Sequence, residues 1–219
     1  MSSTPAKVAD INDARYTLTR PLGRGGQGAV FEVEGGRLAV KVLFDRSPTN
    51  RERLRNQIVM VKRLPLQDLE IARPRELLRE PHLGYVMELL TGMAPLKTLL
   101  TVPKKVPSPI EWYSSTGGLR RRLRLLARAG DVLSALHGKS LVYSDPSPDN
   151  IFVSQSIDGH EVRLIDADNL HLCSTPGARA VFTPWYGAPE LVLCESGPDS
   201  LTELYRLARQ EFFETYQPD

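Results

Sequence analysis

"PLGRGGQGAVFEVEGGRLAVKVL", residues 21–43, decides the fold through the residues that follow its glycines. Gly23, Gly25 and Gly28 match G-x-G-x-x-G, a spacing that two unrelated nucleotide-binding folds share. A dinucleotide-binding βαβ unit needs a helix directly after these glycines. Here the next residues are AVFEV, β-branched and alternating, and the glycines at 35–36 then predict a hairpin into RLAVKVL. The glycine loop therefore joins two strands, which excludes the βαβ unit.

The strand after this hairpin carries residues that suit a nucleotide. In LAVK, Lys41 and Ala39 are two residues apart, so both face the same side of the strand. A lysine at this place can pair with the α- and β-phosphates, while Val30 and Ala39 can pack on an adenine ring. Taken alone, Lys41 would more simply be a solvated lysine on an edge strand.

The composition of the 219-residue chain is that of an ordinary globular protein, with 41% apolar and 25% charged residues. A net charge of +2 gives no reason to expect nucleic acid or a membrane as a partner. No apolar run approaches the roughly 18 residues of a membrane span, and residues 1–10 do not resemble a secretion signal. Cys173 and Cys194 lack metal-site spacing. We therefore expect a cytoplasmic protein with reduced thiols.

Strands come first and helices later, which indicates an α+β chain of two lobes. Residues 1–14 are small and polar, and we expect them to be disordered. A helix is expected with Thr49 or Asn50 as its N-cap, and Pro65 is expected to end it. LGYVMELL, residues 83–90, has the composition of a buried strand. The apolar positions of the helix, at helical spacing, are Leu54, Ile58, Val61 and Leu64.

Residues 102–118 are rich in Pro, Lys, Ser and Gly and predict a long surface loop before a second helix. The apolar stripe expected for that helix consists of Leu119, Leu123, Leu126, Leu133 and Leu136. The opposite face carries Arg120, Arg121, Arg122, Arg124 and Arg128. These arginines could form a nucleic-acid patch, but a solvated face of an amphipathic helix is the favoured interpretation.

Four later stretches of the sequence also carry residues that could form part of a functional site. They are YVMELL (85–90), YSDPSPDN (143–150), VRLIDAD (162–168) and TPWYGAPE (183–190). Singly these could be turn or capping residues. In this order, the motifs resemble those of the eukaryotic-like, bacterial-type serine/threonine protein kinase family.

The resemblance implies a protein-kinase-like two-lobed fold, with a β-rich N-lobe at about 15–88 and a mainly helical, shortened C-lobe at about 91–219. It implies ATP and Mg²⁺ as cofactors. The catalytic residues that it implies are Asp145 as base, Lys41 and Asn150. The implied Mg²⁺ ligands are Asn150 and Asp166. The implied nucleotide-binding residues are Leu22, Gly23, Gly25, Gly28, Val30, Ala39, Lys41, Met87 as gatekeeper, Glu88, Leu90 and Phe152.

The sequence departs from the family pattern in four places. The helix position that offers a glutamate to Lys41 in the family most simply holds Gln57, which can hydrogen-bond to Lys41 but cannot pair charges. Replacing Gln57 by Glu is therefore expected to maintain or raise activity. The D-F-G motif of the family, whose aspartate binds Mg²⁺, reads Asp166-Ala167-Asp168 here, so Ala167 replaces its phenylalanine. Ser147 stands where many serine/threonine kinases have a lysine that contacts the γ-phosphate. Beyond Glu190 the last helices of the family are missing. Candidate stand-ins for the arginine that pairs with this glutamate are Arg206 and Arg209.

The resemblance implies transfer of the γ-phosphate of ATP to serine or threonine of a protein substrate, and the Thr-Pro pair at Thr183 favours these acceptors over tyrosine. The alternative is a pseudokinase that acts as a nucleotide-binding or partner-docking module. A third interpretation is a phosphotransferase that acts on small molecules. The A-P-E segment, residues 188–190, argues against it, because that segment shapes a platform for a protein substrate in the family. Joint retention of Lys41, Asp145, Asn150 and Asp166 favours catalysis.

Two further expectations concern surfaces and regulation. The apolar residues Leu204, Leu207 and Phe212 lack their usual covering helices, which predicts self-association or a partner on the shortened C-lobe. Ser144 stands where many kinases carry an arginine that needs a phosphate on the activation segment. We therefore expect basal activity without phosphorylation of that segment.

Overall fold

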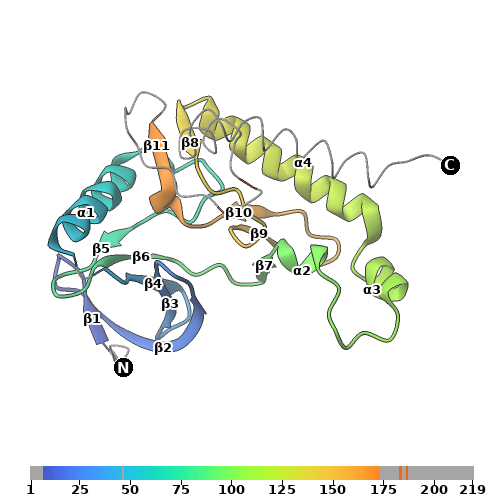
Figure 1. Ribbon diagram of the computed structural model, residues 1–219, viewed down its shortest axis with the longest axis horizontal. Coiled ribbons are helices and arrows are strands. Elements are labelled where there is room, and N and C mark those ends of the chain that lie inside the picture. Colours follow the sequence, from blue (N-terminus) through green and yellow to red (C-terminus); the bar gives the residue numbers. More distant parts are fainter. Residues whose placement is uncertain (1–6, 46, 173–182, 184–185, 187–219) are drawn as a thin grey trace, which may run out of the picture.

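A curled, six-stranded antiparallel sheet forms the N-terminal part of the chain (Figure 1). The computed structural model describes residues 7–45, 47–172, 183 and 186. The strands, in their order across the sheet, are β1 (Lys7–Ala9), β2 (Arg15–Arg24), β3 (Gly28–Val33), β4 (Leu38–Leu43), β6 (Gly84–Glu88) and β5 (Glu76–Leu77). The α+β class expected from the sequence is confirmed.

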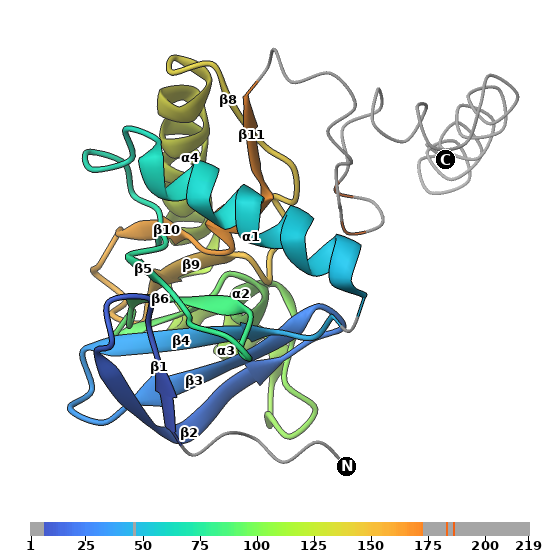
Figure 2. The same ribbon diagram turned by 90° about the vertical axis from the view of Figure 1, so that its left-hand side faces the viewer.

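The rest of the described chain combines helices with short strands. A three-stranded sheet has the order β10 (Val162–Leu164), β9 (Ile151–Ser154) and β7 (Met93–Pro95), and β11 (Leu170–Leu172) pairs with β8 (Leu141–Tyr143). The helices are α1 (Pro48–Arg63), α2 (Lys97–Leu100), α3 (Pro109–Ser115) and α4 (Gly118–His137), with the 3₁₀ turn η1 (Ala167–Asn169). In Figure 2, α1 lies above the curled sheet, between it and the part that contains α4. No helix in the described part is long and apolar enough to cross a membrane.

The expected hairpin between β3 and β4 is confirmed. Gly35 and Gly36 have φ of 95° and 66°, left-handed values that glycine adopts without steric cost. The turn is longer than two residues, because the paired residues nearest to it are Glu32 of β3 and Ala39 of β4. The same register places Val30 opposite Lys41, and Lys41 opposite Tyr85 of β6. Lys41 is thereby held on an interior strand.

The N-cap of helix α1 is Ser47, which lies two residues before the nearer of the two expected N-caps, Thr49. Pro48 occupies the first turn, where a missing N–H costs nothing. The helix ends at Arg63, before Pro65 as expected. Ile58 and Val61 are buried, which confirms that the apolar face packs inward.

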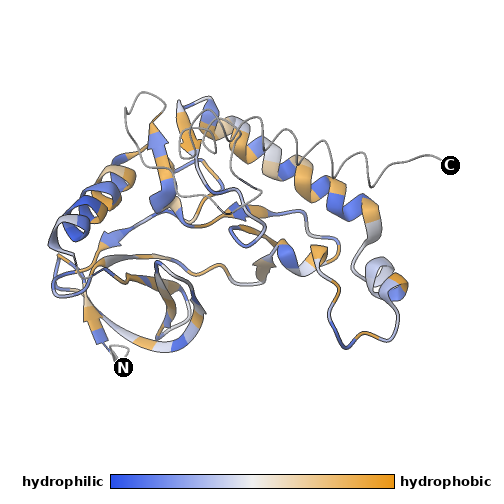
Figure 3. Cartoon of the chain, in the orientation of Figure 1, coloured by the Kyte–Doolittle hydropathy of each residue, from blue (hydrophilic) through white to orange (hydrophobic). Residues whose placement is uncertain are grey.

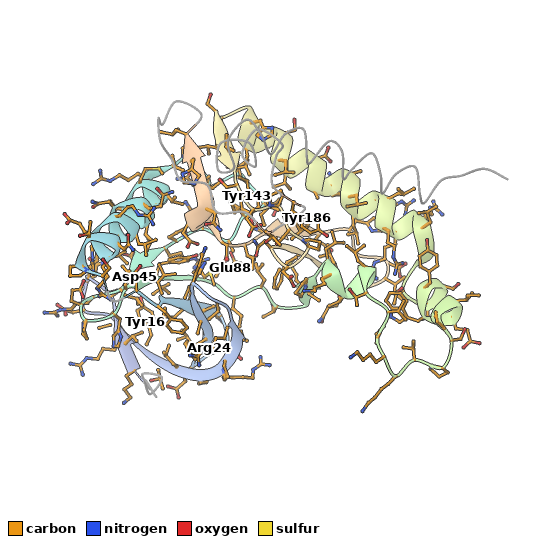
Figure 4. The ribbon with its side chains drawn as sticks, in the orientation of Figure 1. Tyr16, Arg24, Asp45, Glu88, Tyr143 and Tyr186 are labelled. Atoms are coloured by element: carbon orange, nitrogen blue, oxygen red, sulfur yellow. The ribbon has the colours of Figure 1, made fainter. Side chains whose placement is uncertain are left out.

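The expectation of disorder over residues 1–14 is wrong for its described part. Val8 of β1 pairs with Tyr16 of β2, and the buried carboxylate of Asp10 organises the turn between the two strands. Asp10 accepts hydrogen bonds from the backbone N–H groups of Asn12 and Ala14 and from the Tyr16 hydroxyl at 2.7 Å. Burial and this hydrogen bond raise the pKa of Tyr16, labelled in Figure 4, to about 12.

The structure also corrects the loop and the helix face expected beyond residue 102. Helix α3 interrupts the loop, capped by Ser108, whose hydroxyl accepts from the backbone N–H of Glu111. In α4 the leucines 119, 123 and 126 are about half exposed or more. The residues that α4 buries are Arg121, Arg122, Leu125, Ala129, Val132 and Leu136. Figure 3 shows hydrophilic and hydrophobic residues alternating along the ribbon of α4.

Two arginines of α4 are buried, and the terminal nitrogens of each guanidinium donate to backbone carbonyl oxygens, although the Nε of Arg121 has no partner among the described residues. Arg121 donates to the carbonyl of Ser154 at 2.6 Å, which ties α4 to the end of β9. Arg122 donates to the carbonyls of Leu99 and Gly118 at 2.9 and 3.0 Å, and its guanidinium stacks 4.4 Å from the ring centre of Tyr113. Their apolar stems pack like those of ordinary core residues. Hydropathy alone could not assign this face.

This assignment predicts that Arg122→Leu destabilises the protein by about 2 kcal/mol or more, since it leaves the Leu99 carbonyl buried without its donor. Arg120→Leu, the same change at an exposed position of the helix, should change stability by less than about 0.5 kcal/mol. Urea unfolding followed by circular dichroism measures both. Equal effects would contradict the buried face.

Candidate functional site

A cleft of about 1000 Å³ lies between the curled sheet and the rest of the chain, and every residue assigned to the site from the sequence lines it. Glu88, labelled in Figure 4, is the last residue of β6 and belongs to the cleft lining. The residues that were assigned to the site from the sequence and that line the cleft are Leu22, Gly23, Gly25, Gly28, Val30, Ala39, Lys41, Met87, Glu88, Leu90, Asp145, Asn150, Phe152 and Asp166. The tertiary structure thus brings together five separate stretches of sequence, at 22–30, 39–41, 87–90, 145–152 and 166.

The glycine loop between β2 and β3 borders the cleft with an open backbone. No atom lies within 4 Å of the position of a Cβ added to Gly23 or Gly25, so a ligand could approach this backbone closely. Gly28 serves a different purpose, because a Cβ there would come within 2.4 Å of the Val42 carbonyl oxygen. That glycine is required for the pairing of β3 with β4. Beyond the loop, Val30 and Ala39 supply an apolar wall.

Lys41 is buried in a cluster with two aspartates. Its Nζ lies 3.1 Å from both carboxylate oxygens of Asp168 and 3.0 Å from Oδ1 of Asp166. The hydroxyl of Tyr85 donates to Oδ1 of Asp168 at 2.6 Å. Burial would lower the pKa of Lys41, but the two carboxylates outweigh it and raise this pKa. The lysine is therefore firmly cationic.

The hydrogen bond expected between Gln57 and Lys41 is not formed. The Gln57 Nε2 donates instead to the backbone carbonyl oxygens of Leu170 at 2.6 Å and of Asp168 at 3.3 Å. Gln57 therefore connects α1 to the segment after β10, while Asp168 supplies the charge partner of Lys41. The expectation that a glutamate at position 57 would restore an ion pair is withdrawn for this reason.

The loop between β8 and β9 places an acid and an amide together. Asn150 Nδ2 donates to Oδ2 of Asp145 at 2.7 Å and to the Asp145 carbonyl at 3.1 Å. The backbone N–H of Thr183 donates to the other carboxylate oxygen, Oδ1, at 2.8 Å. Asp145 is thereby fixed from two sides at the edge of the cleft. Since the amide nitrogen of Asn150 is engaged, its oxygen is the atom that could bind a cation.

Asp166 occupies a constrained position directly after β10. Its φ of 55° and ψ of 46° are left-handed, a conformation uncommon outside glycine that concentrates at functional sites. Burial raises the pKa of the Asp166 carboxyl, against the opposing effect of Lys41. Its side chain is 22% exposed, compared with 7% for Asp168. Asp166 is therefore the carboxylate that a ligand in the cleft can reach.

The donor set fits a magnesium ion that is completed by phosphate oxygens. Asp166 and Asn150 offer hard oxygen ligands in the same cleft, and Mg²⁺ is usually held by one or two such groups together with substrate phosphates and water. Among the described residues, no three His, Cys, Asp or Glu side chains gather into a complete metal cage. This arrangement suits an ion that arrives with a nucleotide.

Three residues at which the chain differs from the family pattern are buried. Ala167 is fully buried in the core cluster that contains Leu141 and Tyr143. Ser147 and Ser144 are also buried, and the Ser144 hydroxyl has no hydrogen-bond partner among the described residues. The segment 188–190 and the candidate stand-ins Arg206 and Arg209 lie outside the described residues.

Sequence reasoning missed Asp168, Tyr85 and the N–H of Thr183. In the sequence, Asp168 occupies the position of the glycine in D-F-G and was noted only as a departure from that motif. A second carboxylate two residues after Asp166 could have indicated a partner for Lys41. Tyr85 was visible only as a strand residue, and its partner lies 83 residues away. Nothing in the sequence could indicate a backbone N–H contact.

Comparison with known proteins finds serine/threonine protein kinases among the relatives, although no protein-family model matches the chain. The chain is 31% identical to the serine/threonine-protein kinase Pkn1 of Myxococcus xanthus, over 91% of this chain and 28% of Pkn1. It is 28% identical to serine/threonine-protein kinase pkn2 of the same organism, over 89% of this chain and 23% of pkn2. PknA of Mycobacterium tuberculosis is 30% identical over 68% of this chain and 34% of its own length. The chain thus spans about a quarter of the two Myxococcus relatives.

The contacts of Gln57 predict that Gln57→Glu destabilises the protein by about 1–3 kcal/mol, because a carboxylate cannot donate to the two carbonyls and adds negative charge beside them. Asn56→Asp introduces the same charge at the exposed neighbouring position and should cost less than about 0.5 kcal/mol. Thermal unfolding of the two variants is the measurement. A stabilising Gln57→Glu would show that Gln57 faces the lysine after all.

Proposed function

This chain belongs to the serine/threonine protein kinase family as a divergent member, and from that premise we propose that it transfers the γ-phosphate of ATP to a serine or threonine of a protein substrate. The observation that carries the proposal is the meeting of Lys41, Asp145, Asn150 and Asp166 in one cleft. The α+β architecture, with its curled antiparallel sheet, agrees with a kinase fold.

The cleft suggests how the nucleotide would be held. Val30, Ala39 and Phe152 provide apolar surfaces for the adenine, and the open backbone of the glycine loop can approach the phosphates. Lys41 would pair with phosphate oxygens. Asn150 and Asp166 would hold Mg²⁺, whose charge stabilises the phosphoryl group during transfer.

Asp145 has the position and the contacts of a general base. Asn150 and the Thr183 N–H fix both of its oxygens, so the carboxylate is oriented before a substrate arrives. In the proposed reaction it orients the acceptor hydroxyl and takes its proton. The hydroxyl oxygen bonds to the γ-phosphorus, and the bond from this phosphorus to the bridging oxygen of ADP breaks.

The deciding experiment incubates the purified chain with γ-labelled ATP, Mg²⁺ and a generic acceptor protein. Labelled protein supports the proposal. Binding of ATP without transfer would favour the alternative, a nucleotide-binding module with the same fold. The proposed self-association through Leu204, Leu207 and Phe212 concerns residues outside the described part and needs a separate sedimentation measurement.

The roles of the two aspartates predict different failures. Asp166→Asn should abolish the Mg²⁺ dependence of ATP binding, whereas Asp145→Asn should leave ATP affinity nearly intact and lower transfer by roughly 10²- to 10⁴-fold. Titration calorimetry and single-turnover transfer measure the two quantities. Asp158→Asn, in the exposed turn between β9 and β10, is the matched control. Equal losses of ATP affinity in both variants would contradict the assignment.

The buried Ser144 predicts activity without phosphorylation of residues 166–190. No guanidinium stands before Asp145, so no phosphate is needed to neutralise one. Phosphatase treatment, checked by mass spectrometry, should change transfer by less than about threefold. A loss of about tenfold, or roughly 1.4 kcal/mol in the barrier, would mean that another basic residue needs the phosphate.

A further inference from the structure

We propose that Asp168 is the carboxylate that positions Lys41 for phosphate binding, in place of a glutamate on α1. This inference rests on the proposed function, since it concerns a residue of the same cleft. Asp168 would not touch the nucleotide. It would act through Lys41, as a positioning residue.

The geometry of the pair is that of a specific, buried interaction. The Lys41 Nζ is equidistant, at 3.1 Å, from both oxygens of Asp168, and the two side chains are only 5% and 7% exposed. A buried ion pair is stable only when its orientation and remaining hydrogen bonds are good. Tyr85 meets that condition, because its hydroxyl donates to Oδ1 of Asp168 from the strand next to Lys41.

The backbone that carries Asp168 is fixed as well. Gln57 of α1 donates to the carbonyls of Asp168 and Leu170, on either side of the end of η1. Ala167 is fully buried, and β11 continues the segment by pairing with β8. The carboxylate is therefore held by its own side-chain contact, by its backbone and by the packing of its neighbours.

The two aspartates are placed for different tasks. Of the described residues, Asp166 lines the cleft and Asp168 does not. An ammonium group has three N–H donors, and two contacts to Asp168 leave one direction, which Asp166 now occupies at 3.0 Å. When Asp166 binds a cation, that direction becomes open to a phosphate oxygen while Asp168 still holds the lysine.

Three interpretations of Asp168 can be separated. It could position Lys41, bind a cation independently, or only stabilise the fold. If it acts through Lys41, then its loss should have no further consequence once Lys41 is gone. Independent action would instead make the two losses multiply.

The experiment is a double-mutant cycle on the full chain with Asp168→Asn, Lys41→Met and the combination of both. The kcat and the KM for ATP are measured for transfer, and the affinity for Mg²⁺–ATP by calorimetry. Asp168→Asn should lower kcat by about tenfold or more, with a smaller change in KM. The combined variant should match Lys41→Met within about twofold. Asp131→Asn, an exposed carboxylate of α4 paired with Arg128, should match the unaltered chain.

A milder variant guards against loss of folding. Tyr85→Phe removes only the hydroxyl that bonds to Asp168, so it should lower kcat less and have no effect in the Lys41→Met background. If Asp168→Asn does not fold, the cycle of Tyr85→Phe with Lys41→Met tests the inference instead. Multiplying losses in either cycle, or full activity of a folded Asp168→Asn, would overturn the inference.

The proposed function and this inference can fail separately. If the unaltered chain binds Mg²⁺–ATP but transfers nothing, the proposed function is wrong, and the cycle is then read in ATP affinity. Non-additive affinities would uphold the role of Asp168, and additive affinities would overturn it. Absence of Mg²⁺–ATP binding by the unaltered chain would overturn both.

Discussion

The burial of one ammonium group, that of Lys41, is the constraint on which the site depends. A buried charge is unfavourable unless it is paired and hydrogen-bonded, so the interior strand that carries Lys41 requires carboxylates nearby. Asp166 and Asp168 meet this requirement from the segment after β10. The interaction therefore joins the curled sheet to the remainder of the chain, and the cleft forms where they meet.

The cluster also supports the proposal that the cleft holds a cation together with phosphates. Two carboxylates face one lysine, which leaves an excess of negative charge at the more exposed of the two, Asp166. A divalent cation relieves that excess, and Asn150 presents a neutral oxygen in the same cleft. Asp145 lies beyond them, oriented by Asn150 and the Thr183 N–H. Asp145 and Asp166 thus occupy different places at the cleft, as the proposed function requires.

The same rule governs the buried arginines of α4, which lack a carboxylate partner in the described part of the chain. Arg121 and Arg122 are accommodated because carbonyl oxygens at the start of α4, in α2 and at the end of β9 accept their hydrogen bonds. The helix is anchored by these polar contacts as well as by Leu125 and Leu136. Its exposed leucines follow from this orientation, since the arginines occupy the inward face.

The sequence by itself determined the glycine loop between strands, the hairpin at 35–36, and the acid–amide spacing of Asp145 and Asn150. These features depend on neighbours a few residues apart, whose backbone preferences are local. Only the tertiary structure decided which face of α4 packs inward, that β1 forms a strand, and which residue pairs with Lys41. A helix rich in leucine and arginine can turn either face inward, because arginine stems also pack. Lys41 and Asp168 are 127 residues apart, and only the folded chain brings them into contact.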